Sequence, residues 1–168
     1  MKLEQLNALS VEEATTAFMQ CCVAERWVKK MVNGRPYLSS EDLFQRADLY
    51  WGKMLEADLL QAFEGHPKIG DVHSLKQKYA STKQLAAGEQ SAVNAANDEV
   101  LQRLAAGNQA YEQRFGFIFI VCATGKSAAE MLALLEARLP NERDVELLNA
   151  AEEQRKITHI RLQKLLAT

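Results

Sequence analysis

The chain has 168 residues, 20 of them basic and 22 acidic, and a formal net charge of −2. This length suits one compact domain, so we predict a single domain over residues 1–168. The balance of charges excludes a broad basic surface for nucleic acid. No apolar run approaches the ~20 residues that a membrane helix needs. Three cysteines and a polar N-terminus favour a reduced, cytoplasmic protein.

The first half of the chain is predicted to be helical. Only three prolines and eight glycines interrupt the sequence, which favours long helices. Ser10 and Glu13 form a capping-box pattern, and apolar residues follow at helical spacing through Cys21 to Val28. The pattern predicts a helix that ends before Asn33. Cys21 is expected to be a core residue, because buried free cysteines behave as small hydrophobic side chains.

A second predicted helix is capped by Ser39 or Ser40. Apolar residues from Leu43 to Ala62 follow one face over about six turns. The pattern stops at Glu64-Gly65, and a shorter helical piece is predicted over Val72 to Thr82.

The second half continues this pattern. A long helix is expected from about Glu89 to Phe115, and Gly107 need not end it. The apolar run Phe115 to Gly125 has no second run with which to pair, so we interpret it as a helix end or an extended core segment.

Two more helices are expected after this run. Ser127 and Glu130 form a capping box that opens a helix through Arg138, and Asn141 can cap a last helix over roughly Glu142 to Leu166. The predicted fold is all-α, a single multi-helix domain of about seven to nine helices.

Two stretches partly match known motifs, one for a phosphate-binding loop and one for a metal site, and neither match is complete. The stretch Ala123 to Ser127, "ATGKS", lacks the glycine that a phosphate-binding loop needs at the position of Ile120. A loop that leads into a capped helix is the better interpretation. His66 and His73 are seven residues apart, and neither an HExxH pattern nor paired cysteines at zinc spacing occur, so no metal ligands are predicted.

His66 is a stronger candidate for chemistry. Pro67 restricts the backbone of His66 to extended conformations, and Gly65 and Gly70 permit turns that other residues resist. A histidine titrates near neutral pH and suits proton transfer. The pattern alone leaves a catalytic histidine and an ordinary loop histidine equally open.

Arg161 and Glu89 also need an explanation. Arg161 shares a helical face with Ala150, Gln154, Ile157 and Leu165, which predicts an inward arginine with an anionic partner from the protein or a ligand. His159 falls on a different face and is expected at the surface or an interface. Glu89, taken alone, is better explained as a favourable acidic residue at a helix N-terminus.

Four stretches occur in the order and at the separations of one family: "HPKIGD" from His66, "EQ" at Glu89-Gln90, "FGFIFIVCATGKS" from Phe115, and "RKITHIRL" from Arg155. Together they resemble 2-oxo-4-hydroxy-4-carboxy-5-ureidoimidazoline (OHCU) decarboxylase, which forms (S)-allantoin at the end of urate degradation. The resemblance covers nearly the whole chain.

The resemblance implies an all-helical, cytoplasmic homodimer that releases CO2 from a small ureidoimidazoline substrate, with no cofactor, no metal, no nucleic acid and no membrane partner. His66 and Glu89 correspond to the catalytic residues of the family. The expected substrate-binding residues are Pro67, Gln90, Phe117, Ile118, Phe119, Ile120 and Arg161.

Two departures from the family pattern concern substrate contacts. Ala86 stands where many members have a serine, and Ile118 stands where many have a proline. They leave open a cofactor-free lyase or hydrolase that acts on a related ureide. An inactive helical dimer with a binding role is the other alternative, against which His66, Glu89 and Arg161 all count.

Overall fold

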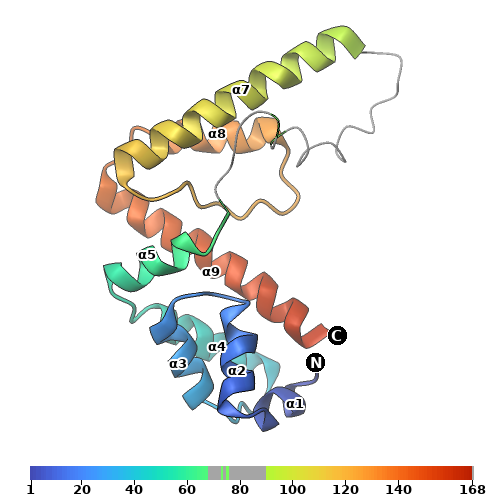
Figure 1. Ribbon diagram of the computed structural model, residues 1–168, viewed down its shortest axis with the longest axis vertical. Helices are drawn as coiled ribbons and strands as arrows, with labels where there is room; N and C mark the ends of the chain where they lie inside the picture. The colour runs from blue at the N-terminus through green and yellow to red at the C-terminus, as the bar shows by residue number, and fades with distance from the viewer. Residues whose placement is uncertain (68–72, 74, 76–89, 168) are drawn as a thin grey trace. The chain divides into compact units, whose positions relative to one another are not determined.

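The computed structural model describes residues 1–67, 73, 75 and 90–167, without the side chains of residues 90–97. Within these residues eight helices occur, α1 to α5 and α7 to α9, and no strand (Figure 1). This confirms the predicted all-α fold. None of the described helices has both the length and the apolar character that crossing a membrane requires. The short helix predicted over Val72 to Thr82 falls outside the described residues, apart from residues 73 and 75.

The chain divides into two compact units, Met1–His66 with Ala151–Thr168, and Pro67–Ala150. The single domain predicted over residues 1–168 stays a prediction. The helices of the first unit are α1 (Leu3–Ala8), α2 (Val11–Met19), α3 (Glu25–Asn33), α4 (Ser40–Trp51), α5 (Glu56–Glu64) and the C-terminal part of α9 (Arg143–Ala167).

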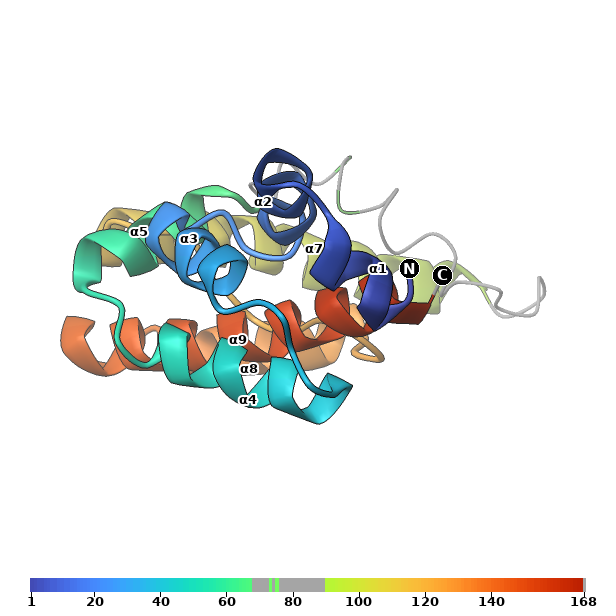
Figure 2. The same ribbon diagram turned by 90° about the horizontal axis from the view of Figure 1, so that it is seen from below.

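Helix α3 is the centre of the first unit, since it packs against α2, α4 and α5. Its core is large and apolar, with fully buried side chains that include Leu6, Phe18, Trp27, Met31 and Leu43. The two ends of the chain lie side by side (Figure 2), because the N-terminal ammonium of Met1 donates to the carbonyl of Leu165 at 3.0 Å.

The helix predicted from Ser10 through Val28 is wrong in its extent. Ser10 does cap α2, but α2 ends at Met19 and α3 begins at Glu25. The side-chain oxygen of Gln61, in α5, accepts the N–H of Glu25 at 2.9 Å and so satisfies a free donor at the start of α3. This partner is 36 residues away, so no local pattern could have indicated the break. The short helix α1 was also not predicted.

The second predicted helix likewise divides in two. Gly52 follows the last residue of α4, and α5 begins only at Glu56. The carboxylate of Asp58 accepts the N–H of Leu55 at 2.9 Å and a hydrogen bond from Arg26 at 2.8 Å. The apolar spacing continues across the break because both helices cover the same core, which is why the pattern resembled one helix.

In the second unit, α7 (Gln90–Phe115) packs against α8 (Ala128–Arg138), followed by the first turns of α9. All three helices were predicted to within about two residues. Gly107 lies inside α7, as expected, and the structure explains it: a Cβ there would lie 2.7 Å from Leu135 of α8. The glycine permits this close approach of the two helices.

The segment between α7 and α8 is an extended core segment, the second of the two forms that the sequence left open. Gly116 leaves α7 with a positive φ of 81°, and Phe117, Phe119 and Ile120 are buried. Ser127 caps α8. The "ATGKS" stretch is the expected loop. Within it the Lys126 ammonium donates to the carbonyl of Cys122 at 2.8 Å.

Candidate active site

His66 lies directly after the C-terminal end of α5. Gly65 caps that helix, and the N–H of His66 donates to the carbonyl of Phe63 at 3.2 Å. Gly65 has an ordinary helical φ of −72°, so the expectation that it supplies an unusual turn is wrong. The position requires glycine for a different reason, because a Cβ there would collide with the side chain of Val23.

We therefore expect Gly65→Ala to destabilise the fold by about 1–3 kcal/mol, as overpacking of a tight contact does. Val23 is β-branched and has few alternative rotamers with which to relieve the clash. Urea denaturation measures the effect, and the matched control is Gly52→Ala, where the nearest atom would be 3.5 Å away. Restoration of stability by a Val23→Ala change in the same chain is part of the expectation; equal stability of all variants would contradict it.

The ring of His66 is held by a side chain from α9. Its Nε2 lies 2.5 Å from Oε1 of Gln154, and the amide nitrogen of Gln154 donates to Oγ1 of Thr158 at 3.0 Å. Gln154 and Thr158 are buried, whereas His66 is half-buried. The histidine is therefore fixed from its inner side by a neutral hydrogen-bonding chain.

Arg161 shares the helical face of Gln154 and Thr158, and it is half-buried as predicted. Its Nη1 donates weakly to the carbonyl of Cys21 at 3.4 Å. In the part of the chain that the structure describes, Arg161 pairs with no carboxylate. Within that part of the chain most of its hydrogen-bond donors are left over, and both partners that the sequence left open, a protein carboxylate and an anionic ligand, stay predictions.

Burial and Arg161 together determine the protonation of His66. Burial lowers the pKa of His66 first and the positive charge of Arg161 lowers it further, while the hydrogen bond with Gln154 acts in the opposite direction. The net pKa lies below the ordinary value of 6.5, so the imidazole is neutral at pH 7. A neutral imidazole can accept a proton.

Cys21 and Cys22 lie near Arg161 and are not nucleophiles. Both are almost completely buried. Burial raises the pKa of Cys21 to about 12 and that of Cys22 to about 11, although Arg161 lowers both somewhat. Both thiols are therefore protonated at neutral pH, and the prediction that Cys21 is a core residue is confirmed.

In the second unit, the predicted pocket wall Phe117 to Ile120 has its aromatic side chains in the core. Phe117 and Phe119 pack edge-on against Tyr111, with ring centroids 5.9 and 5.3 Å away. Only the side chain of Ile118 is partly exposed. Contact with a ligand would therefore involve Ile118 and backbone groups, not the aromatic rings.

A buried ionic cluster anchors this wall. Arg138 donates to the carbonyl of Ile120 at 2.8 Å and to the fully buried carboxylate of Glu146 at 2.7 Å. Burial alone would raise the pKa of Glu146, but hydrogen bonds from Asn141, Tyr111, Asn149 and Arg138 outweigh it and hold the pKa below its usual value. Asn141, expected as a helix cap, thus donates to Glu146.

The other predicted site residues are described only in part. Pro67 follows His66 and is exposed. Gln90 is the first residue of α7, but its side chain is outside the described residues, as is the whole of Glu89. The structure thus brings His66 and Arg161 together around Gln154.

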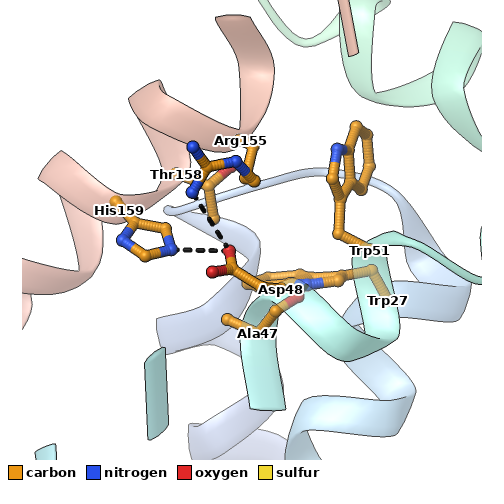
Figure 3. Close-up of a pocket in the computed structure, with 7 residues that line it drawn as sticks. All are labelled: Trp27, Ala47, Asp48, Trp51, Arg155, Thr158 and His159. Carbon is orange, nitrogen blue, oxygen red and sulfur yellow. Dashed lines mark hydrogen bonds and ion pairs between the residues drawn. The ribbon is translucent and has the colours of Figure 1, made fainter. Parts of the chain in front are cut away.

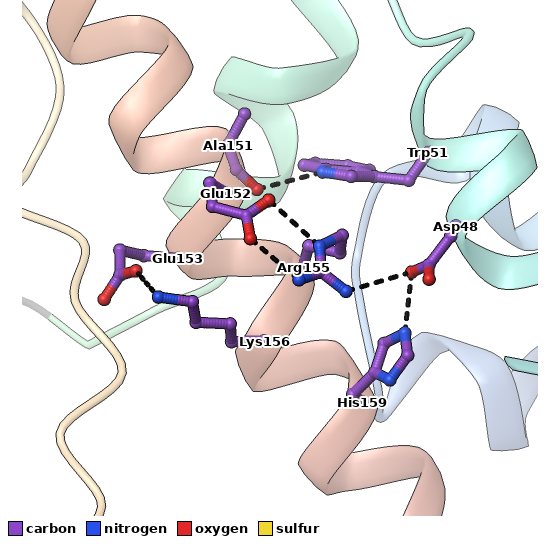
Figure 4. Close-up of polar contacts among 8 residues, drawn as sticks. All are labelled: Asp48, Trp51, Ala151, Glu152, Glu153, Arg155, Lys156 and His159. Atoms are coloured by element: carbon purple, nitrogen blue, oxygen red, sulfur yellow. Dashed lines mark hydrogen bonds and ion pairs between the residues drawn. The ribbon is translucent and has the colours of Figure 1, made fainter.

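A second polar cluster occupies a neighbouring face of α9. Nε2 of His159 lies 2.6 Å from Oδ1 of Asp48, Arg155 approaches the same oxygen at 3.6 Å, and Trp51 donates to the carbonyl of Ala151 at 3.0 Å (Figure 4). The ring of His159 also stacks on Phe44. His159 is therefore mostly covered and joins α4 to α9.

The small hollow beside this cluster is lined by polar groups that are largely paired already. Its lining consists of Trp27, Ala47, Asp48, Trp51, Arg155, Thr158 and His159 (Figure 3). Both indole N–H groups already donate to backbone carbonyls. Asp48 is already paired with His159 and Arg155, which leaves little to recognise a polar ligand.

Gln154 is the site residue that sequence analysis did not identify as such. The sequence pattern places Gln154 only as a neighbour of Arg161 on one helical face, and Thr158 only within the last-helix motif. Their spacing of four and three residues, 154, 158 and 161, puts three polar side chains on one side of the helix. A polar row on a face that also carries core residues is the signal that could have identified them.

Within the described residues, no group of three or more His, Cys, Asp or Glu side chains is arranged to hold a metal ion. The described site holds a histidine that is neutral at pH 7 beside an arginine, in an all-helical chain. Comparison with known proteins identifies its family. A model of the OHCU decarboxylase family matches residues 7–163, and the chain belongs to this family of carboxy-lyases.

Individual relatives agree with this assignment. The chain is 30% identical to 2-oxo-4-hydroxy-4-carboxy-5-ureidoimidazoline decarboxylase of Amia calva, over 99% of this chain and 95% of that protein. It is 34% identical to the uric acid degradation bifunctional protein TTL of Arabidopsis thaliana, over 95% of this chain. The chain spans only 49% of that bifunctional protein, and 32% of another from Bacillus sp. TB-90.

Solved structures share the fold. A crystal structure of OHCU decarboxylase in the presence of (S)-allantoin superposes with a TM-score of 0.72 and 36% sequence identity, over 90% of this chain and 97% of that one. A structure of (S)-allantoin synthase superposes with a TM-score of 0.71, but at 16% identity it supports the fold alone.

Proposed function

We propose that this chain decarboxylates OHCU to (S)-allantoin, the final step of urate degradation. The observation that carries the proposal is the neutral His66, held by Gln154 beside Arg161, in a chain that the family model matches almost completely. His66 belongs to the "HP" motif and Arg161 to the last-helix motif through which the sequence resembles the family.

The reaction needs a group that moves a proton. Loss of CO2 from the substrate ring leaves an electron pair that the conjugated ring can take up, and a proton must then reach one face of the ring carbon that becomes the stereocentre. His66 is neutral at pH 7 and fixed in position, so it can take a proton and return it to one face. Glu89 is proposed to adjust the protonation of His66, a role that Glu89→Gln kinetics would test.

Arg161 is proposed to bind a substrate oxygen other than the departing carboxylate. A tight ion pair with that carboxylate would stabilise the ground state more than the transition state and would slow decarboxylation. A carbonyl or ureido oxygen suits the free guanidinium donors better. Gln90, Pro67 and the backbone of residues 117–120 are proposed to complete the substrate contacts.

A homodimer in the cytoplasm is the proposed state of the protein. The family resemblance implies it, and two strongly exposed apolar side chains of the first unit, Leu38 and Leu55, are consistent with a covered surface. Sedimentation of the purified chain at micromolar concentration tests the dimer, and a single monomeric species would contradict it.

The proposed activity is tested by generating OHCU in the cuvette. Urate is oxidised and hydrolysed by the upstream enzymes, and circular dichroism then follows the appearance of (S)-allantoin. We expect the chain to accelerate this signal well above spontaneous decay, with (S)-allantoin in excess over its enantiomer. A trace identical to that without the chain would refute the decarboxylase function and favour the related-ureide or binding alternative.

A further inference from the structure

Gln154 has a placement that substrate contact does not explain. It is a polar side chain with an exposed fraction of only 1%, and it lies on the inner face of α9. A buried amide is costly unless its donor and acceptor groups are both used. Here the oxygen meets Nε2 of His66 and the nitrogen meets Thr158, so the amide joins the candidate base to the core.

The direction of these hydrogen bonds determines which nitrogen of His66 carries its proton. The Gln154 amide group donates to Thr158, so its oxygen faces the histidine. An oxygen can only accept, so Nε2 of the neutral ring must be the protonated nitrogen.

We propose that Gln154 is the positioning residue of the candidate base: its side-chain oxygen holds the Nε2–H of His66, so that Nδ1 is the nitrogen that exchanges a proton with the substrate. The hydrogen bonding stands independently of the activity, whereas the catalytic consequence rests on the proposed function. Any action of Glu89 on the proton of His66 is then limited to Nδ1.

Among the described residues few charges surround this pair, which makes the role of Gln154 measurable. Arg161 on α9 is the cation that acts on His66, and burial acts in the same direction. Between α2 and α3, the thiols of Cys21 and Cys22 are protonated at neutral pH and carry no charge. Glu64, in the same helix end as His66, is exposed and screened by solvent.

The test is a titration of His66 by NMR in the full-length protein without substrate, with ¹⁵N-labelled histidine. The chain has three histidines, and the His66→Asn spectrum assigns the signal of interest. In the wild type we expect the ¹⁵N shifts of a neutral ring protonated at Nε2. Because no substrate is present, this result does not depend on the chain being a decarboxylase.

Two substitutions are expected to move the titration in opposite directions. Gln154→Glu puts a carboxylate against the ring and should raise the His66 midpoint by about 1–3 pH units. Gln154→Leu removes the hydrogen bond that, among the described residues, favours the charged ring, and it should lower the midpoint. Gln163→Glu adds the same charge at an exposed position of α9 and is the matched control, with no change expected.

The coupled assay extends the test to catalysis. The acid limb of kcat/KM should move with the NMR midpoint in Gln154→Glu, a shift that a purely structural glutamine would not produce. A wild-type ring protonated at Nδ1 would overturn the proposal, and so would a Gln154→Glu titration equal to that of Gln163→Glu. Inactivity of every form, together with the expected titrations, would refute only the proposed reaction.

Discussion

His66→Asn is expected to slow the enzymatic decarboxylation of OHCU by roughly 10²–10⁴-fold, the usual contribution of a positioned acid–base group. Asparagine keeps a polar side chain of similar reach, so its amide can still donate to Gln154, but it cannot accept and return a proton near neutral pH. The loss should appear mainly in kcat, because the donors of Arg161 stay in place to bind the substrate. Initial rates of (S)-allantoin formation measure it.

The matched control is His159→Asn. His159 is the histidine of the Asp48 cluster, and asparagine can still donate to Asp48. We expect this variant to keep the wild-type rate. Thermal unfolding followed by circular dichroism verifies that both variants fold. Full activity of a folded His66→Asn protein would remove His66 from the mechanism, even with an active wild type.

The lowered pKa of His66 also leads to a prediction of how the reaction rate depends on pH. Burial and then Arg161 lower the pKa of His66 below 6.5, so the neutral form that the proposed mechanism uses persists to pH values below the ordinary histidine range. The acid limb of kcat/KM should therefore lie below pH 6.5. The pH dependence of folding stability has the opposite sign to that of a histidine paired with a carboxylate. The unfolded chain binds the proton of His66 more readily than the folded chain, so stability falls as the pH drops below the unfolded pKa.

Arg138→Met is expected to destabilise the fold by about 3–5 kcal/mol, the cost of leaving one partner of a buried ion pair uncompensated. Glu146 has no exposed surface, and Arg138 has a side-chain exposure of only 12%. The substitution also removes the donor to the carbonyl of Ile120 and the cation above the ring of Phe119, 4.6 Å from its centroid. Urea denaturation at pH 7 measures the loss.

Two further variants separate charge from packing. In Arg138→Met/Glu146→Gln the buried charge is gone, so we expect the double variant to recover part of the loss. Arg103→Met removes the ion pair between Arg103 and Glu136, two side chains that are 51% and 46% exposed. This change should lower the free energy of unfolding by less than about 1 kcal/mol. Equal effects of Arg138→Met and Arg103→Met would contradict the proposed anchor.

The pH dependence of stability gives an independent measure of Glu146. Its folded pKa is below the usual 4.5, so its contribution to stability is complete above that value and is lost as the pH falls through the folded pKa. Glu146→Gln should therefore flatten the acid limb of the stability curve. It should leave the stability difference between pH 6 and pH 8 unchanged.

The sequence predicted best the features whose causes are local. The capping boxes at Ser10 and Ser127 are both present, and the long helices α7 and α9 run nearly as expected. The breaks before Glu25 and Glu56 were missed. Gln61 caps α3 from a distant helix, and the residue before α5, Leu55, does not have the side chain of an N-cap. The spacing of apolar residues indicates which face of a helix is buried. It does not distinguish one long helix from two helices that cover the same core.

The motifs of the sequence by themselves determined the all-α class, the family resemblance, and His66 and Arg161 as candidates, because short-range hydrogen bonds and residue spacing are encoded along the chain. Only the tertiary structure decided which atoms meet. Gln154 holds His66 from 88 residues away. Glu146 holds Arg138, which in turn donates to the carbonyl of Ile120. The hydrogen-bond partner of a side chain, its burial and therefore its protonation depend on segments that are distant in the sequence and meet only on folding. The spacing of residues along one helix cannot predict these contacts.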